Sequence, residues 1–81
     1  MIVTYWYTHG IGVKIFKNTT HAYFKEHGVY PTVDIQLPSF LNKNGYVCRA
    51  EQGHSVTGLE RRGISMTEED AIVFLLKWAY D

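Results

Sequence analysis

The hydrophobic and polar positions of the N-terminal half alternate in two places, which is the pattern of a strand with one buried face, and a third segment has strand-forming residue types with large side chains on both faces. Residues 2–8 (IVTYWYT) combine β-branched and aromatic types, and residues 13–17 (VKIFK) alternate after a turn that contains two glycines. These two segments predict an N-terminal hairpin. Residues 32–37 alternate most regularly, and Pro38 follows them, a residue that cannot continue a central strand. We therefore expect a central strand over 32–37.

A short helix is expected between the hairpin and the central strand. Residues 21–27 follow the sequence NTT, whose residue types favour a helix start, and Gly28 stands where a glycine commonly follows a helix end. After the central strand, two weaker strands over 46–50 and 55–59 flank a turn at 52–53. This pattern predicts a second hairpin.

The last segment, residues 67–80, predicts an α-helix. Thr67 is a favourable capping residue, and the acidic run EED that follows it suits the positive end of the helix dipole. The apolar side chains of this segment cover roughly twice the arc that a helix on a single sheet needs to bury. We expect one side of the helix to pack on the central strand, with Phe74, Leu75 and Trp78 against Val33, Ile35 and Leu37.

The remaining apolar side of this helix needs a second cover. It carries Ile72, Val73, Leu76 and Tyr80. Three covers are consistent with the pattern: the 38–45 loop with its residues Phe40 and Leu41, a twofold-related second chain, or an external partner. Solvent exposure of this side in a monomer would identify it as a partner site.

Together these elements predict an α+β fold in a single compact domain over residues 1–81. The expected sheet is small, mostly antiparallel and built of four to five strands, with one short helix and the C-terminal helix packed on it. Composition supports an ordered chain, because 46% of the residues are hydrophobic and 15% are aromatic.

Charge and cysteine content narrow the function classes. Eight basic and eight acidic residues give a formal net charge of zero, which argues against a general binder of nucleic acid or anionic membranes. Cys48 is the only cysteine, so no internal disulfide can form. The chain starts without the pattern of a secretory signal, and no apolar run is long enough to span a bilayer. We expect a cytoplasmic location.

Three histidines fall close together in the sequence, but their spacing does not favour a metal site. His21 and His27 are six positions apart, which on a helix turns their side chains about 120° from one another. Cys48 and His54 flank a predicted turn and could form a nucleophile and its base, but no orienting third residue is apparent. We expect structural histidines, a core cysteine, no metal, no cofactor and no catalytic residue.

The most favoured function is a non-enzymatic protein–protein interaction module. Large aromatic side chains and arginines dominate binding hot spots, and this chain has six tyrosines and two tryptophans. A small phage-encoded or accessory inhibitor of a host system fits the chain size, and a homodimer is a second option. The candidate partner-binding residues are Tyr5, Trp6, Tyr7, Arg61, Arg62, Val73, Leu76 and Tyr80.

The alternative is a single-stranded nucleic-acid-binding protein. In it the aromatic residues of the predicted hairpin would stack on unpaired bases, and nearby lysines and arginines would contact phosphates. The stacking residues would be Tyr5, Trp6, Tyr7 and Phe16. No motif in the chain is a signature of a known family, so both functions rest on residue types and patterns alone.

Overall fold

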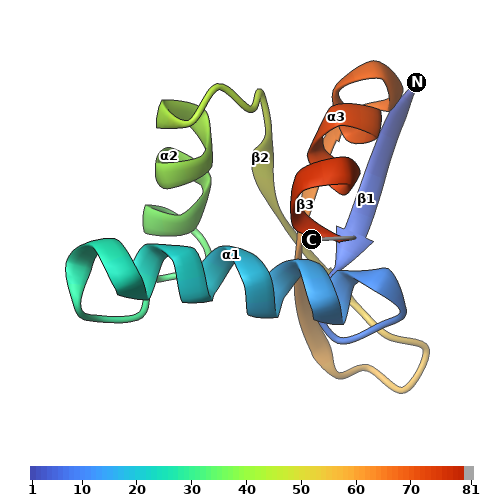
Figure 1. Cartoon of the computed structure of the whole chain (residues 1–81). Coiled ribbons are helices and arrows are strands. Elements are labelled where there is room, and N and C mark those ends of the chain that lie inside the picture. The colour runs from blue at the N-terminus through green and yellow to red at the C-terminus, as the bar shows by residue number, and fades with distance from the viewer. Residues whose placement is uncertain (80–81) are drawn as a thin grey trace.

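The computed structural model describes residues 1–79 and has three helices and a three-stranded antiparallel sheet (Figure 1). The elements follow in the order β1 (Ile2–Trp6), α1 (Ile11–His27), α2 (Gln36–Lys43), β2 (Arg49–His54), β3 (Glu60–Thr67) and α3 (Glu68–Trp78). β3 is the central strand, and β1 and β2 are the two edges. The predicted α+β class fits this fold, whereas the predicted four to five strands are wrong.

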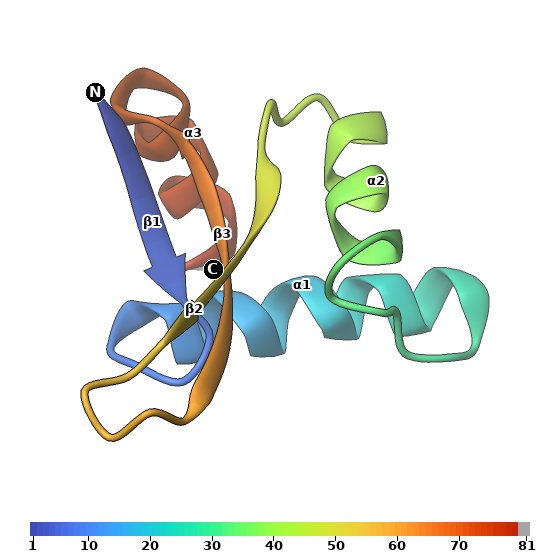
Figure 2. The same ribbon diagram turned by 180° about the vertical axis from the view of Figure 1, so that it is seen from behind.

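The helices lie on one side of the sheet. α3 packs on the face of β1 and β3, α1 runs across one end of the strands, and α2 packs on the far half of α1 (Figure 1). Seen from behind, the strands lie in front of α3 and no helix covers them (Figure 2). The core lies between the helices and the near face of the sheet. Its largest fully buried apolar side chains are Ile15, Leu37, Leu41, Ile64 and Phe74.

The predicted N-terminal hairpin does not form, because residues 13–17 belong to α1. Ile11, Ile15 and Thr19 follow one another at intervals of four, and this spacing places them on one side of a helix. The buried threonines are accommodated by hydrogen bonds to the preceding turn: the Thr19 hydroxyl donates to the Ile15 carbonyl (2.8 Å) and the Thr20 hydroxyl to the Phe16 carbonyl (2.6 Å). The helical spacing therefore outweighs the short alternation.

The end of α1 agrees with the sequence. α1 stops at His27, and Gly28 takes the left-handed conformation (φ 77°), with its N–H donating to the Phe24 carbonyl. The helix predicted over 21–27 is thus the last part of a helix that begins ten residues earlier, at Ile11.

The predicted strand over 32–37 is also wrong, because Gln36 starts α2. Thr32 and Gln36 stabilise this start reciprocally: the Gln36 N–H donates to the Thr32 hydroxyl (3.1 Å), and the Thr32 N–H to the Gln36 side-chain oxygen (2.9 Å). Pro38 lies in the first turn, where its missing N–H would have no helical partner anyway. Leu37 is buried, whereas Ile35, which a strand would place on the same face, is 72% exposed.

The second hairpin forms, but further along the chain than expected. β2 and β3 are joined by residues 55–59, where the Ser55 N–H donates to the Leu59 carbonyl (2.8 Å) and Gly58 has a positive φ of 83°. The predicted turn at 52–53 lies inside β2, and Gly63 lies inside β3. Gly53 and Gly63 therefore occupy strand positions, where the Trp6 ring lies against both of them.

The C-terminal helix is confirmed, with Thr67 as its cap. The Thr67 hydroxyl accepts from the Asp70 N–H (3.3 Å) and donates to the Asp70 carboxylate (2.9 Å). Phe74 and Trp78 are buried as predicted, but they face β3, α1 and Tyr46 instead of a strand at 32–37. Among residues 1–79, no helix is long and apolar enough to cross a membrane.

Candidate functional site

The outer side of α3 carries three exposed aliphatic residues, which we call the α3 patch: Ile72, Val73 and Leu76. Their exposed fractions are 64%, 60% and 66%. Positions 72, 73 and 76 share one side of a helix, because they are one, three and four residues apart. The opposite side of α3 is buried in the core and carries Ala71, Phe74 and Trp78.

The 38–45 segment does not cover the α3 patch. Its residues 38–43 belong to α2, and its apolar residues Phe40 and Leu41 are themselves buried. Phe40 packs edge-on against Tyr23 of α1 (ring centroids 5.3 Å apart). The 38–45 segment, which the sequence offered as a cover for this side of the helix, therefore does not cover it. The α3 patch faces solvent.

Charges lie at both ends of the α3 patch. Glu68 and Glu69 occupy the exposed first turn, and Lys77 lies in the last turn with its ammonium nitrogen 5.5 Å from the centroid of the Trp78 ring. Both placements suit the helix dipole. The patch is thus apolar in the middle, acidic at its start and basic at its end.

Trp6 occupies the helix-free face of the sheet. Its ring reaches from β1 over Gly63 of β3 to Gly53 of β2: a Cβ added to Gly63 would lie 2.9 Å from ring atom Cε3, and one added to Gly53 would lie 3.0 Å from Cη2. The Arg61 guanidinium lies 4.2 Å from the ring centroid. Trp6 is therefore half-buried, with glycines beneath it and an arginine against it.

The neighbouring tyrosines face the other way. Tyr5 pairs with Ile64 on the near face of the sheet and is half-buried, and Tyr7 is buried. Tyr7 packs against Phe16 of α1 (centroids 4.9 Å apart), and burial raises the pKa of its hydroxyl well above the ordinary value. The aromatic set that base stacking would use is thus divided between the two faces of the sheet and α1.

Arg61 and Arg62 also point to opposite faces. Arg62 bonds to the Glu60 carboxylate and pairs with Asp34 (3.1 Å). These contacts lower the pKa of Glu60 and raise that of Arg62, chiefly through the hydrogen bond between the two side chains. Arg62 thus stabilises the segment before α2, and only Arg61 lies beside Trp6.

The histidines and Cys48 do not assemble a reactive centre. Cys48 directly precedes β2 and His54 is its last residue, so an extended chain separates them by about 20 Å at 3.3 Å per residue. Burial and the nearby charge of Asp70 raise the pKa of the Cys48 thiol to about 11. His27 packs on Tyr23 (centroids 4.3 Å apart). Within residues 1–79, no three metal-ligating side chains lie close enough together to hold an ion.

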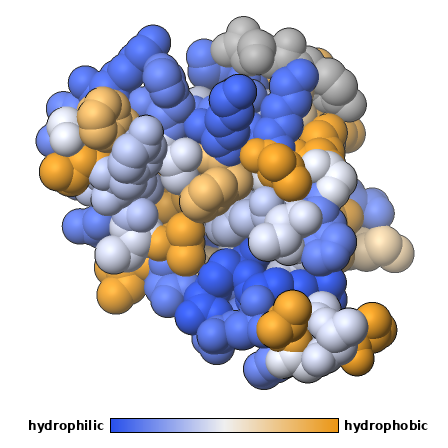
Figure 3. Space-filling model, turned by 90° about the horizontal axis from the view of Figure 1, so that it is seen from below, coloured by the Kyte–Doolittle hydropathy of each residue, from blue (hydrophilic) through white to orange (hydrophobic). Residues whose placement is uncertain are grey.

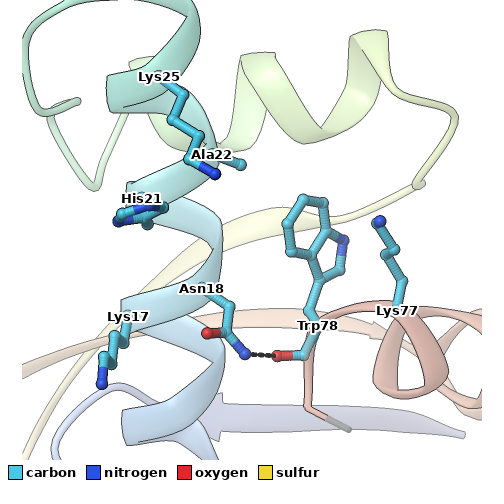
Figure 4. Close-up of a pocket in the computed structure, with 7 residues that line it drawn as sticks. All are labelled: Lys17, Asn18, His21, Ala22, Lys25, Lys77 and Trp78. Carbon is cyan, nitrogen blue, oxygen red and sulfur yellow. Dashed lines mark hydrogen bonds between the residues drawn. The ribbon is translucent and has the colours of Figure 1, made fainter. Parts of the chain in front are cut away.

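A basic hollow of about 480 Å³ lies between α1 and the end of α3 (Figure 4). The Asn18 amide donates to the Trp78 carbonyl across it (2.7 Å). Lys17 points away from Trp78, whereas Lys25 and Lys77 lie on different walls (Figure 4). These cationic groups do not converge on one position, so the hollow lacks the geometry of a defined anion site.

Seen from below, where α1 runs, hydrophobic residues form separate patches among hydrophilic ones (Figure 3).

Only part of the predicted partner-binding set comes together. Val73 and Leu76 lie side by side on α3, Trp6 and Arg61 lie together on the helix-free face, and Tyr80 falls outside the described residues. Ile72 completes the α3 patch; the sequence placed it on the uncovered apolar side of the predicted helix, one turn from Leu76, although not among the candidate partner-binding residues. Comparison of the chain with models of known families, with curated proteins and with solved structures found no match.

Proposed function

We propose that this protein is a non-enzymatic protein-binding module and that the α3 patch is its contact surface. The observation that carries the proposal is the exposure of three aliphatic side chains on a helix whose other side is already buried. Water contact with these groups is unfavourable, and a partner that covers them removes that cost.

The α3 patch contributes appreciably to binding but is small. Full burial of a Val, Leu or Ile side chain is worth about 1.5–3 kcal/mol, so three side chains that are each nearly two-thirds exposed contribute on the order of 3–5 kcal/mol. Association costs at least about 4 kcal/mol in lost translational and rotational freedom. A partner must therefore also contact surface beside α3.

A protein is the favoured partner class because of the pattern of the surface. An exposed helix side with apolar residues one turn apart matches a groove or a second helix on another protein. The charged first and last turns fix the direction in which such a partner lies. The inhibitor role, the phage origin and the cytoplasmic location stay predictions from the sequence.

The test compares variants of the full chain in partner capture. Leu76→Lys places a charge in the middle of the α3 patch, and Val56→Lys places the same charge at a fully exposed valine in the 55–59 loop. Both variants should fold as the wild type does, which circular dichroism and thermal melting check. A specific partner should be retained by the wild type and by Val56→Lys and lost by Leu76→Lys.

The captured protein is then purified and titrated against each variant by calorimetry, at low and at high salt. Apolar contact predicts an affinity that depends weakly on salt, whereas phosphate binding by a nucleic-acid binder falls steeply with salt. Equal binding by wild type and Leu76→Lys, both in capture and in self-association, would refute the proposed surface.

A further inference from the structure

The two edges of the sheet differ in how they are protected. β2 carries Arg49 and Glu51, and charged side chains on an edge discourage pairing with another strand. β1 reads IVTYW, without a charge, a proline or a glycine. β1 is therefore an edge strand that lacks the usual devices against pairing.

Hydrogen bonds on either side of β1 define which of its backbone groups point outward. The Tyr7 N–H donates to the Arg62 carbonyl, and the Met1 carbonyl accepts from the Glu68 N–H. Because successive residues of a strand alternate, the N–H and C=O groups of Ile2 and Thr4 point away from β3. At Trp6 this edge is closed by the start of α1, since a Cβ at Gly12 would lie 1.9 Å from the Trp6 carbonyl oxygen. The open edge therefore comprises Ile2 to Thr4.

The α3 patch extends toward the same edge. Asp70 lies near Cys48, which precedes β2, so Asp70 marks the β2 side of α3. Ile72 lies about 160° around the helix from Asp70, and Leu76 about 120°. Ile72 is therefore on the β1 side of α3, and Leu76 lies between that side and the outer side.

We propose that the partner at the α3 patch is a second copy of this chain, which pairs its β1 edge antiparallel with this β1 and lays its α3 beside this α3. This inference rests on the proposed function, because it names the occupant of the same surface. The result is a continuous six-stranded sheet about a twofold axis, with both copies of α3 on the same face. The strand edge supplies the additional contact that the α3 patch requires.

The spacing of the two helices fits this arrangement. α3 contacts both β1 and β3 and lies over that pair of strands (Figure 1). In the joined sheet, the midpoint of one β1–β3 pair lies two strand spacings from the midpoint of the other pair. At 4.8 Å per spacing this distance is about 9.6 Å. Packed helices lie about 8–10 Å apart. The strand pairing therefore brings the two α3 helices to contact distance at Ile72 without moving either helix.

The register fits as well. Pairing that uses only the open edge centres on Val3 and sets Ile2 opposite Thr4 of the second copy. β1 and α3 start side by side and run in the same direction (Figure 1), and the Glu68 N–H donates a hydrogen bond to the Met1 carbonyl. Val3 lies about 6.6 Å further along the strand and Ile72 about 6 Å further along the helix. A twofold axis that passes through the sheet at Val3 therefore also passes close to Ile72 on α3.

The helix dipoles support a second copy. Two α3 helices that cross antiparallel near Ile72 oppose their dipoles favourably. An edge strand that pairs with its own copy, beside a helix that does the same, gives a surface that is complementary to itself, as a twofold interface requires.

The test measures self-association of the full chain by analytical ultracentrifugation together with hydrogen exchange of single amides. Wild type should form a dimer with rising concentration, and the Thr4 amide should become protected in parallel. Leu76→Lys should weaken the dimer on the order of thirtyfold or more. Thr4→Pro should weaken it as well, because it removes an outward N–H that β3 does not use. Val56→Lys should leave it unchanged.

A chain that is monomeric at all concentrations, or a dimer whose Thr4 amide stays unprotected, overturns this inference. If the chain is monomeric but Leu76→Lys still loses a captured partner, the proposed function stands and only the second copy is refuted.

Discussion

The ring of Trp6 lies against the backbone of Gly53, two strands away across the helix-free face of the sheet. A Cβ at Gly53 would approach the far end of the ring to 3.0 Å, and the same ring covers Gly63 in between. The two glycines are thus the floor on which an indole lies flat. Trp6 replaces, on this face, the cover that α3 provides on the other.

Alanine at these two glycines should have unequal effects. At Gly63 the new methyl would lie 2.4 Å from the Tyr5 carbonyl oxygen, so β1 and β3 must separate, and we expect a loss of roughly 1–3 kcal/mol in unfolding free energy. At Gly53 only the end of the Trp6 ring must move, and the lost backbone freedom of the unfolded chain offsets part of the strain. Urea unfolding of both variants measures the difference. Equal losses would contradict this account.

Tyr7→Phe should stabilise the protein. The Tyr7 hydroxyl is buried and has no hydrogen-bond partner among residues 1–79, and an unsatisfied buried polar group costs about 1–3 kcal/mol. The ring contacts with Phe16 remain in the variant. We expect a higher midpoint of denaturation, with Tyr30→Phe at an exposed position as the unchanged control. A destabilised Tyr7→Phe variant would show that the hydroxyl is bonded.

Stability should decline at alkaline pH, beginning with Cys48. Burial, and secondarily Asp70, raises the pKa of this thiol from 9.0 to about 11. The fold therefore favours the neutral thiol: its contribution is complete below pH 9 and is lost as the pH rises toward 11. Cys48→Ala should flatten this part of the stability profile. Tyr7, whose pKa is also raised by burial, should add a decline above pH 10 that Tyr7→Phe removes.

Two substitutions on α3 should separate its buried and exposed sides. Phe74 is fully buried, so Phe74→Ala should cost on the order of 3–5 kcal/mol, a large part of the stability of a domain this size. Leu76→Ala, measured at high dilution, should change stability by less than about 0.5 kcal/mol. Thermal melting of the two variants measures both losses of stability. A large loss for Leu76→Ala at high dilution would mean that the residue is covered within one chain.

The sequence predicted the C-terminal half better than the N-terminal half. α3, its cap Thr67 and the glycine after α1 follow from local signals that act within one turn. The strands at 13–17 and 32–37 were misassigned because five or six alternating residues also fit a helix of period 3.6. Only the longer spacing of Ile11, Ile15 and Thr19 distinguishes the two.

The candidate site was predicted in part for a similar reason. The excess apolar arc of α3 is visible in the sequence, and the structure leaves Val73 and Leu76 exposed. The separation of Tyr7 from Trp6, and of Arg62 from Arg61, follows from strand alternation that the sequence does contain. The position of β1 at an edge depends on the order of strands in the sheet, which no local pattern encodes.

The charges of this neutral chain are unevenly distributed. Lys14, Lys17 and Lys25 lie on α1, which crosses one end of the sheet, and the acidic first turn of α3 lies at the other end. These two helix segments therefore present local fields of opposite sign although the net charge of the chain is zero. Such fields orient an approaching molecule within about one Debye length, some 8 Å at physiological salt, instead of attracting it from afar. Added salt should consequently slow productive encounters while leaving the lifetime of the apolar contact nearly unchanged.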